Sequence, residues 1–409
     1  MPQPLINITR KHAFTYAMFL VLYEFLTYIA NDMVMPGMIH VVDSFHGPES
    51  AIASSLTAYV LGGASLQLFL GPLSDRYGRR PVMILGAFFF FLCTLFIACS
   101  NSIDQFLVAR FFQGMGLCFI CVVGYATLQE IFAEMDAVRL IAIMANVSII
   151  APLLGPLLGA IFLHYFSWRI LFVIIAVVSL VALWGLWRFM PESIGQTKRD
   201  GAVIHVVSLS PRVIAANYKA LLLNRPFMFG AFALGLLSLP CVAWIALAPV
   251  ILVIDAKLSM IQYGLWQLPL FGAYILGNVV LQRLTHSRSI KTMVSLGSTI
   301  AIVGLFGMFI LPWMMGNHFI WLMPGMILYF IGSGIAAAPM NRHTLFSTNV
   351  SKGTASALVS MITMSILAVG IEAANYMYLT HSNVLFGLCC ALIGVGYLVC
   401  LLGVFRKRV

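Results

Sequence analysis

Charged residues are scarce in this chain. They make up 9% of its 409 residues, whereas hydrophobic residues make up 61%, and the mean hydropathy is +1.00. An average soluble domain holds about 25% charged residues. The deficit excludes an ordinary soluble globular protein, and it predicts a polytopic membrane protein with nearly the whole chain in the bilayer.

The sequence also lacks the motifs of several enzyme classes. It contains no GxxxxGK[ST] phosphate loop and no HExxH pair, which excludes these types of ATP-hydrolysing and zinc site. All nine histidines fall in predicted loops or near predicted helix ends, which argues against a histidine proton relay. We expect a protein that is not an enzyme and that needs no metal and no cofactor.

Cysteine occurs eight times, but no pair has the surroundings of a metal or redox site. Cys118 and Cys121 have the CxxC spacing, yet both lie inside one predicted helix and no second pair is nearby. We interpret the cysteines as small packing residues.

Twelve apolar segments are close to the length of about 20 residues that crosses a bilayer as a helix. We predict an all-α membrane protein of two pseudo-symmetric six-helix bundles, residues 1–190 and 226–409, joined by the basic linker 191–225. Within the linker, Pro211–Leu223 is predicted to form a short amphipathic helix at the membrane surface. The predicted spans are 13–38, 50–71, 81–100, 103–127, 138–164, 167–190, 226–252, 260–282, 290–313, 318–341, 353–380 and 383–405.

The positive charges follow a pattern along the predicted spans. The net charge is +10, and most of the 23 Lys and Arg residues fall in loops on one side. Basic loops stay in the cytoplasm, so this side and both termini are predicted to be cytoplasmic, and the charge does not indicate nucleic-acid binding. The loops on the other side, such as 39–49 and 253–259, are short, so we expect no extracellular domain.

Two acids stand in the first apolar segment, at Glu24 and Asp32. Ionisable residues at membrane depth are costly, and they usually mark a functional site. Eight helical positions correspond to a rotation of about 80° and a rise of about 12 Å. Both carboxyl groups can therefore face one interior cavity at different depths. The alternative is that buried partners satisfy the two acids in a purely structural role.

Three further motifs carry polar or small residues at fixed places. A turn between the second and third spans reads Gly71-Pro-Leu-Ser-Asp75-Arg76-Tyr-Gly78-Arg79-Arg80, the fourth span contains Arg110-Phe-Phe-Gln113-Gly114, and the fifth reads Ala151-Pro-Leu-Leu-Gly155-Pro156-Leu-Leu-Gly159-Ala160. Glycines allow a tight turn, and small residues four positions apart allow close helix contact. Arg110 should lie near the level of Asp32, so the two residues can act as partners. The alternative is a permanent structural ion pair.

The first motif closely resembles the signature loop of the major facilitator superfamily, and the third resembles the motif of its drug/proton antiporters. Together with Leu22-Tyr-Glu-Phe, Asn31-Asp32 and Gly370-Ile-Glu372, they make the chain similar, from end to end, to the MdfA-like multidrug/proton antiporters. The resemblance implies proton-driven export of chloramphenicol-like, lipophilic cationic and zwitterionic drugs across the bacterial inner membrane. We expect a monomer whose partners are drugs, protons and lipids.

The resemblance also implies roles for individual residues. In the family, the acid at Asp75 meets the start of the eleventh helix, here residues 352–354, and the arginine at Arg79 pairs with an acid, here Glu130. The expected proton-coupling residues are Glu24, Asp32 and Arg110. The candidate substrate-binding residues are Glu24, Asp32, Tyr28, Asn31, Gln113, Asn146 and Trp244. The expected gating residues are Gly71, Asp75, Arg79, Arg80, Glu130, Gly155 and Pro156.

Other functions remain open at this point. Within the transporter class, the alternative is a proton-coupled importer of a small nutrient or metabolite, which would more often lack the Gly155-Pro156 motif. A membrane enzyme would need catalytic groups near the midplane, where the sequence offers only carboxylates and one arginine, and a channel would show no proton counterflow. Glu372 and Arg342 have no role assigned by the sequence.

Overall fold

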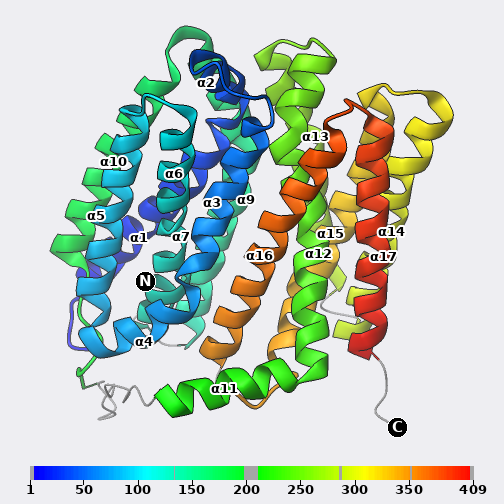
Figure 1. Cartoon of the computed structure of the whole chain (residues 1–409). Helices are drawn as coiled ribbons and strands as arrows, with labels where there is room; N and C mark the ends of the chain where they lie inside the picture. Colours follow the sequence, from blue (N-terminus) through cyan, green and yellow to red (C-terminus); the bar gives the residue numbers. More distant parts are fainter. Residues whose placement is uncertain (1–3, 133, 198–210, 285–287, 351, 406–409) are drawn as a thin grey trace.

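The computed structural model shows a chain built of helices (Figure 1). The description covers residues 4–132, 134–197, 211–284, 288–350 and 352–405. In Figure 1 the upper end carries α2 (Met38–Ser44), and the lower end carries the turn between α4 and α5 and the helix α11 (Pro211–Leu223).

The first half of the chain forms one bundle, at the left of Figure 1. Besides α2, its helices are α1 (Arg10–Asp32), η1 (Met35–Gly37), α3 (Ala51–Ser65), α4 (Gln67–Tyr77), α5 (Arg79–Ala98), α6 (Ile103–Gly114), α7 (Gly116–Cys118), η2 (Phe119–Gly124), α8 (Tyr125–Ile131), α9 (Glu134–Tyr165) and α10 (Trp168–Phe189).

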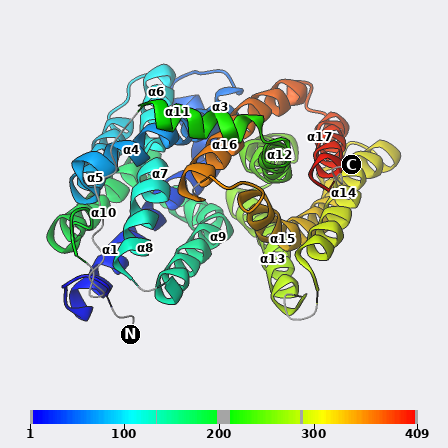
Figure 2. The same ribbon diagram turned by 90° about the horizontal axis from the view of Figure 1, so that it is seen from below.

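The second half forms the other bundle, and α11 lies crosswise beneath the molecule (Figures 1 and 2). The predicted amphipathic helix is confirmed as a helix with the same bounds. The remaining helices are α12 (Arg225–Ala248), η3 (Pro249–Asp255), α13 (Met260–Leu284), α14 (Ile290–Met315), η4 (Phe319–Leu322), α15 (Met323–Leu345), α16 (Lys352–Tyr378) and α17 (Asn383–Phe405).

A helix lies at each of the twelve predicted spans. Among the described residues, ten helices are long and apolar enough to cross a membrane, and the pair α3–α4, bent by 43°, makes an eleventh. The remaining predicted span, 138–164, falls on α9, where many side chains lie outside the described part. One loop prediction is wrong in detail, because residues 39–44 of the expected loop 39–49 belong to the helix α2.

Glycine allows the helices that carry the polar residues to touch. A Cβ atom at Gly62 of α3 would meet the Phe111 carbonyl of α6, and a Cβ at Gly114 of α6 would meet the Tyr59 carbonyl of α3. Without side chains at these two places, the backbones of α3 and α6 pack directly against each other. This contact brings Tyr59 of α3 to Arg110 of α6.

Candidate functional site

Glu24 lies in the middle of α1 and is 1% exposed. The hydroxyl of Tyr125, at the start of α8, donates a hydrogen bond of 2.7 Å to Glu24 Oε1. The second carboxyl oxygen, Oε2, is buried without a hydrogen-bond partner, and no described cationic side chain pairs with it. A buried charge without a partner is costly, so this carboxyl group is suited to hold a proton or to receive a cation from outside the protein.

Asp32, at the end of α1, is 5% exposed and belongs to a different network. Asn31 Nδ2 donates to Asp32 Oδ1 over 3.2 Å, and Arg110 Nη2 donates to Asn31 Oδ1. Arg110 and Asp32 are both described, and they form no direct ion pair. The hypothesis of a permanent structural ion pair is therefore wrong in this conformation: the amide of Asn31 stands between the two charges and contacts both.

Arg110 is fully buried and is held by neutral groups. Its Nη1 donates to Gln113 Oε1 over 2.7 Å, its Nε donates to Ser55 Oγ over 3.3 Å, and its guanidinium carbon lies 4.6 Å from the centre of the Tyr59 ring. Gln113 in turn donates to Thr94 Oγ1 over 2.9 Å. Several neutral acceptors and a ring face thus stabilise the buried cation. Gln113, predicted as a substrate contact, is occupied within this network.

The fifth-span motif lies directly against the second acid. A Cβ atom at Gly155 of α9 would lie 2.6 Å from Asp32 Cβ, and a Cβ at Gly159 would meet the Met33 carbonyl. Gly155 and Pro156 are both buried. The absence of side chains on this face of α9 lets the helix approach α1 at the position of Asp32, so the structure brings a predicted gating residue and a predicted coupling residue into contact.

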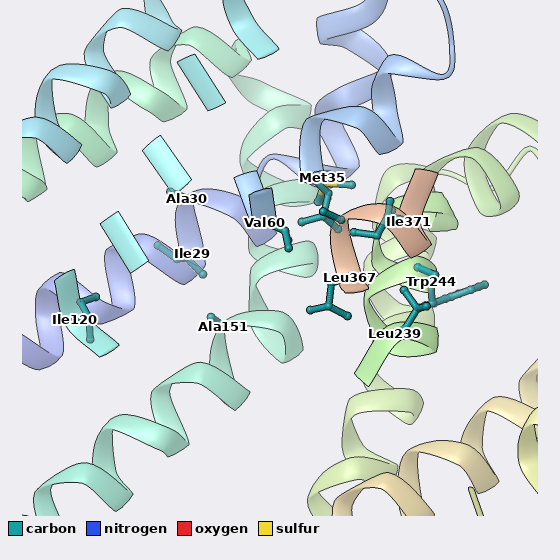
Figure 3. Close-up of a cluster of buried hydrophobic side chains, with 14 of the residues drawn as sticks. Ile29, Ala30, Met35, Val60, Ile120, Ala151, Leu239, Trp244, Leu367 and Ile371 are labelled. Atoms are coloured by element: carbon teal, nitrogen blue, oxygen red, sulfur yellow. The ribbon is translucent and has the colours of Figure 1, made fainter. Parts of the chain in front are cut away.

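Asp32 also lies near the second half of the chain. The helix α13 of the second half packs against α9 and contacts η1, which follows Asp32 in the chain. Figure 3 shows the apolar residues in this region, with Val60 and Ala151 from the first half and Leu367 and Ile371 from α16. The acid therefore lies at a mostly apolar junction between the halves, as a site for lipophilic ligands requires.

The other predicted binding residues are placed differently. Tyr28 is half-buried on α1, and the side chain of Asn146 lies outside the described part of the structure. Trp244 is fully buried within the second half, where its Nε1 donates to Gln267 Oε1 over 2.9 Å and its ring packs against Phe386. In Figure 3 the ring extends away from the first half. The structure does not bring Trp244 to the two acids, and its role in binding stays a prediction.

The signature turn forms a charge cluster at the lower end. Arg79 Nη2 lies 2.6 Å from Asp75 Oδ1 and 2.8 Å from Glu130 Oε1, so the structure brings together the predicted pair of Arg79 and Glu130. The helix α4, which contains Gly71 and Asp75, packs against α16. The expected contact of Asp75 with residues 352–354 stays a prediction, because the side chains of residues 352 and 353 lie outside the described part.

Sequence reasoning missed a further acid in this cluster. Glu192, just after α10, accepts hydrogen bonds from the backbone amides of Arg79 over 2.9 Å and of Arg80 over 3.1 Å. It thereby caps the N-terminus of α5, where a negative charge is favourable. Gly78 has φ of +101°, and a Cβ there would lie 2.5 Å from Glu192 Oε2, so the turn requires glycine. The available signal was an acid directly after the sixth predicted span, at the start of a mostly basic linker.

A second polar cluster joins the two halves at the upper end. His381, after α16, lies 2.7 Å from Asp255 Oδ1 through its Nδ1 and 3.8 Å from Glu49 Oε1 through its Nε2. The Tyr378 hydroxyl donates to Asp255 Oδ2 over 2.6 Å. Glu49 belongs to the first half and the other three residues to the second, so this cluster ties the two halves together above the acids of α1.

The two residues without a sequence assignment now have places. Glu372 Oε2 accepts a hydrogen bond of 3.5 Å from Asn375 Nδ2, which also donates to the Ser50 carbonyl of the first half over 3.1 Å. Glu372 thus lies beside the upper junction of the halves. Arg342 is exposed on α15, with its guanidinium 5.0 Å from the Phe346 ring.

The upper cluster gives the junction a dependence on pH. Burial raises the pKa of the Glu49 carboxyl above its ordinary value, while the facing His381 lowers this pKa and Asp255 raises it. Glu49 therefore holds a proton more tightly when the halves are joined than when it faces water. Acidification through the range just above the ordinary glutamic acid pKa of about 4.3 should favour the joined form.

This expectation can be measured with spin labels at Ser44 and Met315, which are both exposed, after replacement of the exposed Cys99 by serine. The distance distribution should shift to the joined form on acidification. In Glu49→Gln the joined form should persist at all pH values, since the amide resembles the protonated acid. Asp43→Asn, at an exposed acid outside the cluster, is the control. An unchanged pH response in Glu49→Gln would contradict the assignment.

Comparison with known proteins identifies the family. A family model described as Major Facilitator Superfamily matches residues 20–371. The multidrug transporter MdfA of Yersinia pestis bv. Antiqua (strain Angola) is 46% identical over 369 residues, which cover 90% of this chain and 88% of the relative. The multidrug transporter MdfA of Edwardsiella ictaluri (strain 93-146) is 43% identical over 398 residues, which cover 97% of this chain and 95% of the relative.

Solved structures show the same fold at low identity. The crystal structure of a D-xylose-proton symporter superimposes with a TM-score of 0.76 at 14% identity, covering 97% of this chain and 98% of that one. The human organic anion transporter MFSD10 (TETRAN) gives a TM-score of 0.64 at 17% identity, covering 97% of this chain and all of that one. These likenesses concern the architecture alone.

Two helical bundles (Figure 1) with buried acids near their junction are the plan of a membrane transport protein. Like its named relatives, the protein is a transporter and not an enzyme. The chain belongs to the Major Facilitator Superfamily. Within it, the chain belongs with the MdfA transporters, which confirms the resemblance carried by its motifs.

Proposed function

We propose that the protein is a multidrug exporter that exchanges lipophilic cationic, zwitterionic and chloramphenicol-like drugs for protons across the bacterial inner membrane by alternating access. The relatives named multidrug transporter support the substrate class. The observation that carries proton exchange is the pair of buried carboxyl groups on α1, at Glu24 and Asp32, neither of which has a direct cationic partner among the described side chains.

The two acids have different parts in this proposal. Glu24 has a free oxygen at Oε2, so a cationic drug supplies the missing partner and expels the proton. Asp32 acts on Arg110 through the amide of Asn31. Protonation of Asp32 removes the negative charge on one side of that amide. This changes the electrostatic environment of Arg110 and of the groups that hydrogen-bond to it. Since this network joins α1, α3 and α6, the proton state of Asp32 biases how these helices pack.

The charged clusters at the two ends of the molecule also fit transport by alternating access. We assign the lower end, with its basic turn and α11, to the cytoplasm, together with both termini. The cluster of Asp75, Arg79, Glu130 and Glu192 acts there as the inner gate, and the cluster around His381 acts at the outer end. The exporter works as a monomer, with the proton gradient as its energy source and without a cofactor.

The proposal is tested with inverted membrane vesicles that hold the full-length protein. Once the vesicle interior has been acidified, addition of a cationic drug should release protons from the vesicles, and the drug should accumulate inside. Vesicles with the double variant Glu24→Gln/Asp32→Asn are the control and should show neither effect. Drug accumulation that persists with ATP after an uncoupler has collapsed the gradient would overturn the proposal. Drug movement in the same direction as protons would favour the importer instead.

A further inference from the structure

A groove of about 1270 Å³ opens at the lower end of the second half. It lies where the beginnings of α12 and α14 meet the end of α17 (Figure 1), away from the two acids of α1. Its volume exceeds the range of about 300–1,000 Å³ that is usual for small-molecule pockets. The lining residues are Leu223, Asn224, Arg225, Pro226, Phe229, Ser295, Ser298, Thr299, Ile302, Leu398, Val399, Leu401, Leu402, Gly403 and Phe405.

The groove has one apolar wall and one polar end. Leu398, Val399 and Leu402 project from α17 with exposed fractions of 42%, 56% and 66%, so this wall faces the hydrocarbon of a bilayer. Across from it, α14 contributes the hydroxyl residues Ser295 and Thr299. A ligand that fits both must carry a long apolar part and a polar part.

Two cations lie at the polar end. Arg225, the first residue of α12, is exposed and lines the groove. Lys291, in the first turn of α14, is exposed, and its Nζ lies 5.5 Å from the ring centre of the lining residue Phe405. Neither cation appears in a described salt bridge. The charge at this end therefore suits an anionic head group.

The matching place in the first half differs in its charges. There, α5 and α10 take the positions that α14 and α17 take in the second half, and Glu192 after α10 caps the N-terminus of α5. The sequence after α17, residues 406–409, contains no Asp or Glu. The second half thus has no acidic side chain at the corresponding sequence position, although it has the cations.

We propose that this groove binds an anionic phospholipid from the leaflet at the lower end. The phosphate lies between Arg225 and Lys291, and an acyl chain lies along Leu398, Val399 and Leu402. Basic pockets between transmembrane helices bind anionic head groups in this way. The ligand acts in the second half as Glu192 does in the first, by placing a negative charge where α12 and α14 begin. The proposal concerns a lipid site and does not depend on which substrates are transported.

The test compares phosphatidylglycerol and phosphatidylcholine of identical acyl chains, added to the delipidated full-length protein. Native mass spectrometry measures bound lipid, and thermal unfolding measures the stabilisation. Each basic residue near an anionic lipid surface strengthens the binding of that lipid. The double variant Arg225→Gln/Lys291→Gln should therefore lose affinity for phosphatidylglycerol by roughly tenfold or more. Its affinity for phosphatidylcholine should not change.

Arg10→Gln is the matched control. Arg10 is the first residue of α1, as Arg225 is of α12, but it lies in the other half and does not line the groove, so phosphatidylglycerol binding should be unchanged. Thr299→Trp fills the groove without altering charge, and it should weaken binding of both lipids. Equal affinity of the wild type for the two lipids would overturn the proposal, as would an unaltered phosphatidylglycerol affinity in Arg225→Gln/Lys291→Gln.

Discussion

Replacement of Asp32 by asparagine is expected to abolish pH-driven export of every substrate. The substitution keeps the size of the side chain but removes the only acid that Asn31 links to Arg110 in the described structure. Arg110 is fully buried, so it stays charged among neutral groups whatever the proton gradient does. A coupling step that depends on the charge of residue 32 then cannot occur. Export should fall to the background of cells without the protein.

Replacement of Glu24 by glutamine should have a selective effect. A cationic drug loses its countercharge, and a charge-assisted hydrogen bond contributes about 1.5–3 kcal/mol, which corresponds to a loss of roughly tenfold or more in affinity. A neutral drug such as chloramphenicol does not need that charge. The amide can still accept the hydrogen bond that Tyr125 donates, so an apolar pocket should keep its shape and neutral drugs should be affected much less.

Both variants are measured by drug resistance and by vesicle transport, with one cationic and one neutral substrate. Asp104→Asn, at an exposed acid near the start of α6, is the control for the loss of a carboxylate and should behave as the wild type. If Asp32→Asn retains full pH-driven export of both substrates, the assignment of Asp32 as the principal coupling acid is wrong. Equal losses for both drugs in Glu24→Gln would contradict its selective role.

The sequence predicted the spans well because hydrophobic length is a property of continuous segments. The same is true of α11, whose bounds agree with the prediction. Depth along a helix was also accessible, since rise per residue places Arg110 near the level of Asp32. These features depend on spacing within one segment and need no knowledge of how helices rotate against each other.

The contacts between helices were predicted less well. Adjacent residues on a helix differ by about 100° in direction, and the structure shows that it is Asn31, not Asp32, that contacts Arg110. The position along the helix axis alone could not show which of Asn31 and Asp32 contacts Arg110. For Trp244 the rotation places the ring inside the second half, against Phe386.

Clusters built from loop residues had no periodic signal at all. Glu49 and His381 are far apart in the chain, and only the packing of the two halves brings them together. Glu192 likewise reaches the amides of Arg79 and Arg80 from a linker whose course the sequence does not define.

Replacement of Gly155 by alanine is expected to impair export nearly as severely as loss of Asp32, without touching any charge. The new Cβ would lie 2.6 Å from Asp32 Cβ and 3.3 Å from the Asp32 carbonyl carbon. Atoms this close to the backbone of α1 cannot move aside as a flexible side-chain end can. Either α9 must move away from α1, or Asp32 must turn, and both changes disturb the contact of Asp32 with Asn31.

The effect is expected to be large because the contact of α9 with α1 positions Asp32. If Asp32 is displaced, Asn31 can keep its hydrogen bond to Arg110 while it loses the one to Asp32. The acid and the cation are then no longer linked through one amide. Export of cationic and neutral drugs should therefore fall together, in contrast to Glu24→Gln. The protein should still insert into the membrane, because overpacking usually costs only about 1–3 kcal/mol.

Gly272→Ala provides the matched control, since a Cβ at Gly272 of α13 would meet no atom within 4 Å beyond its own stretch of helix backbone. It makes the same chemical change in a membrane helix and should leave export unaltered. Vesicle transport is measured for both variants at equal protein levels, with detergent-solubilised thermal unfolding to confirm that each is folded. Wild-type export in a folded Gly155→Ala protein would show that the approach of α9 does not position Asp32 for coupling. If export is lost in Gly155→Ala and retained in Gly272→Ala, the close approach of α9 at Gly155 holds the coupling acid in place.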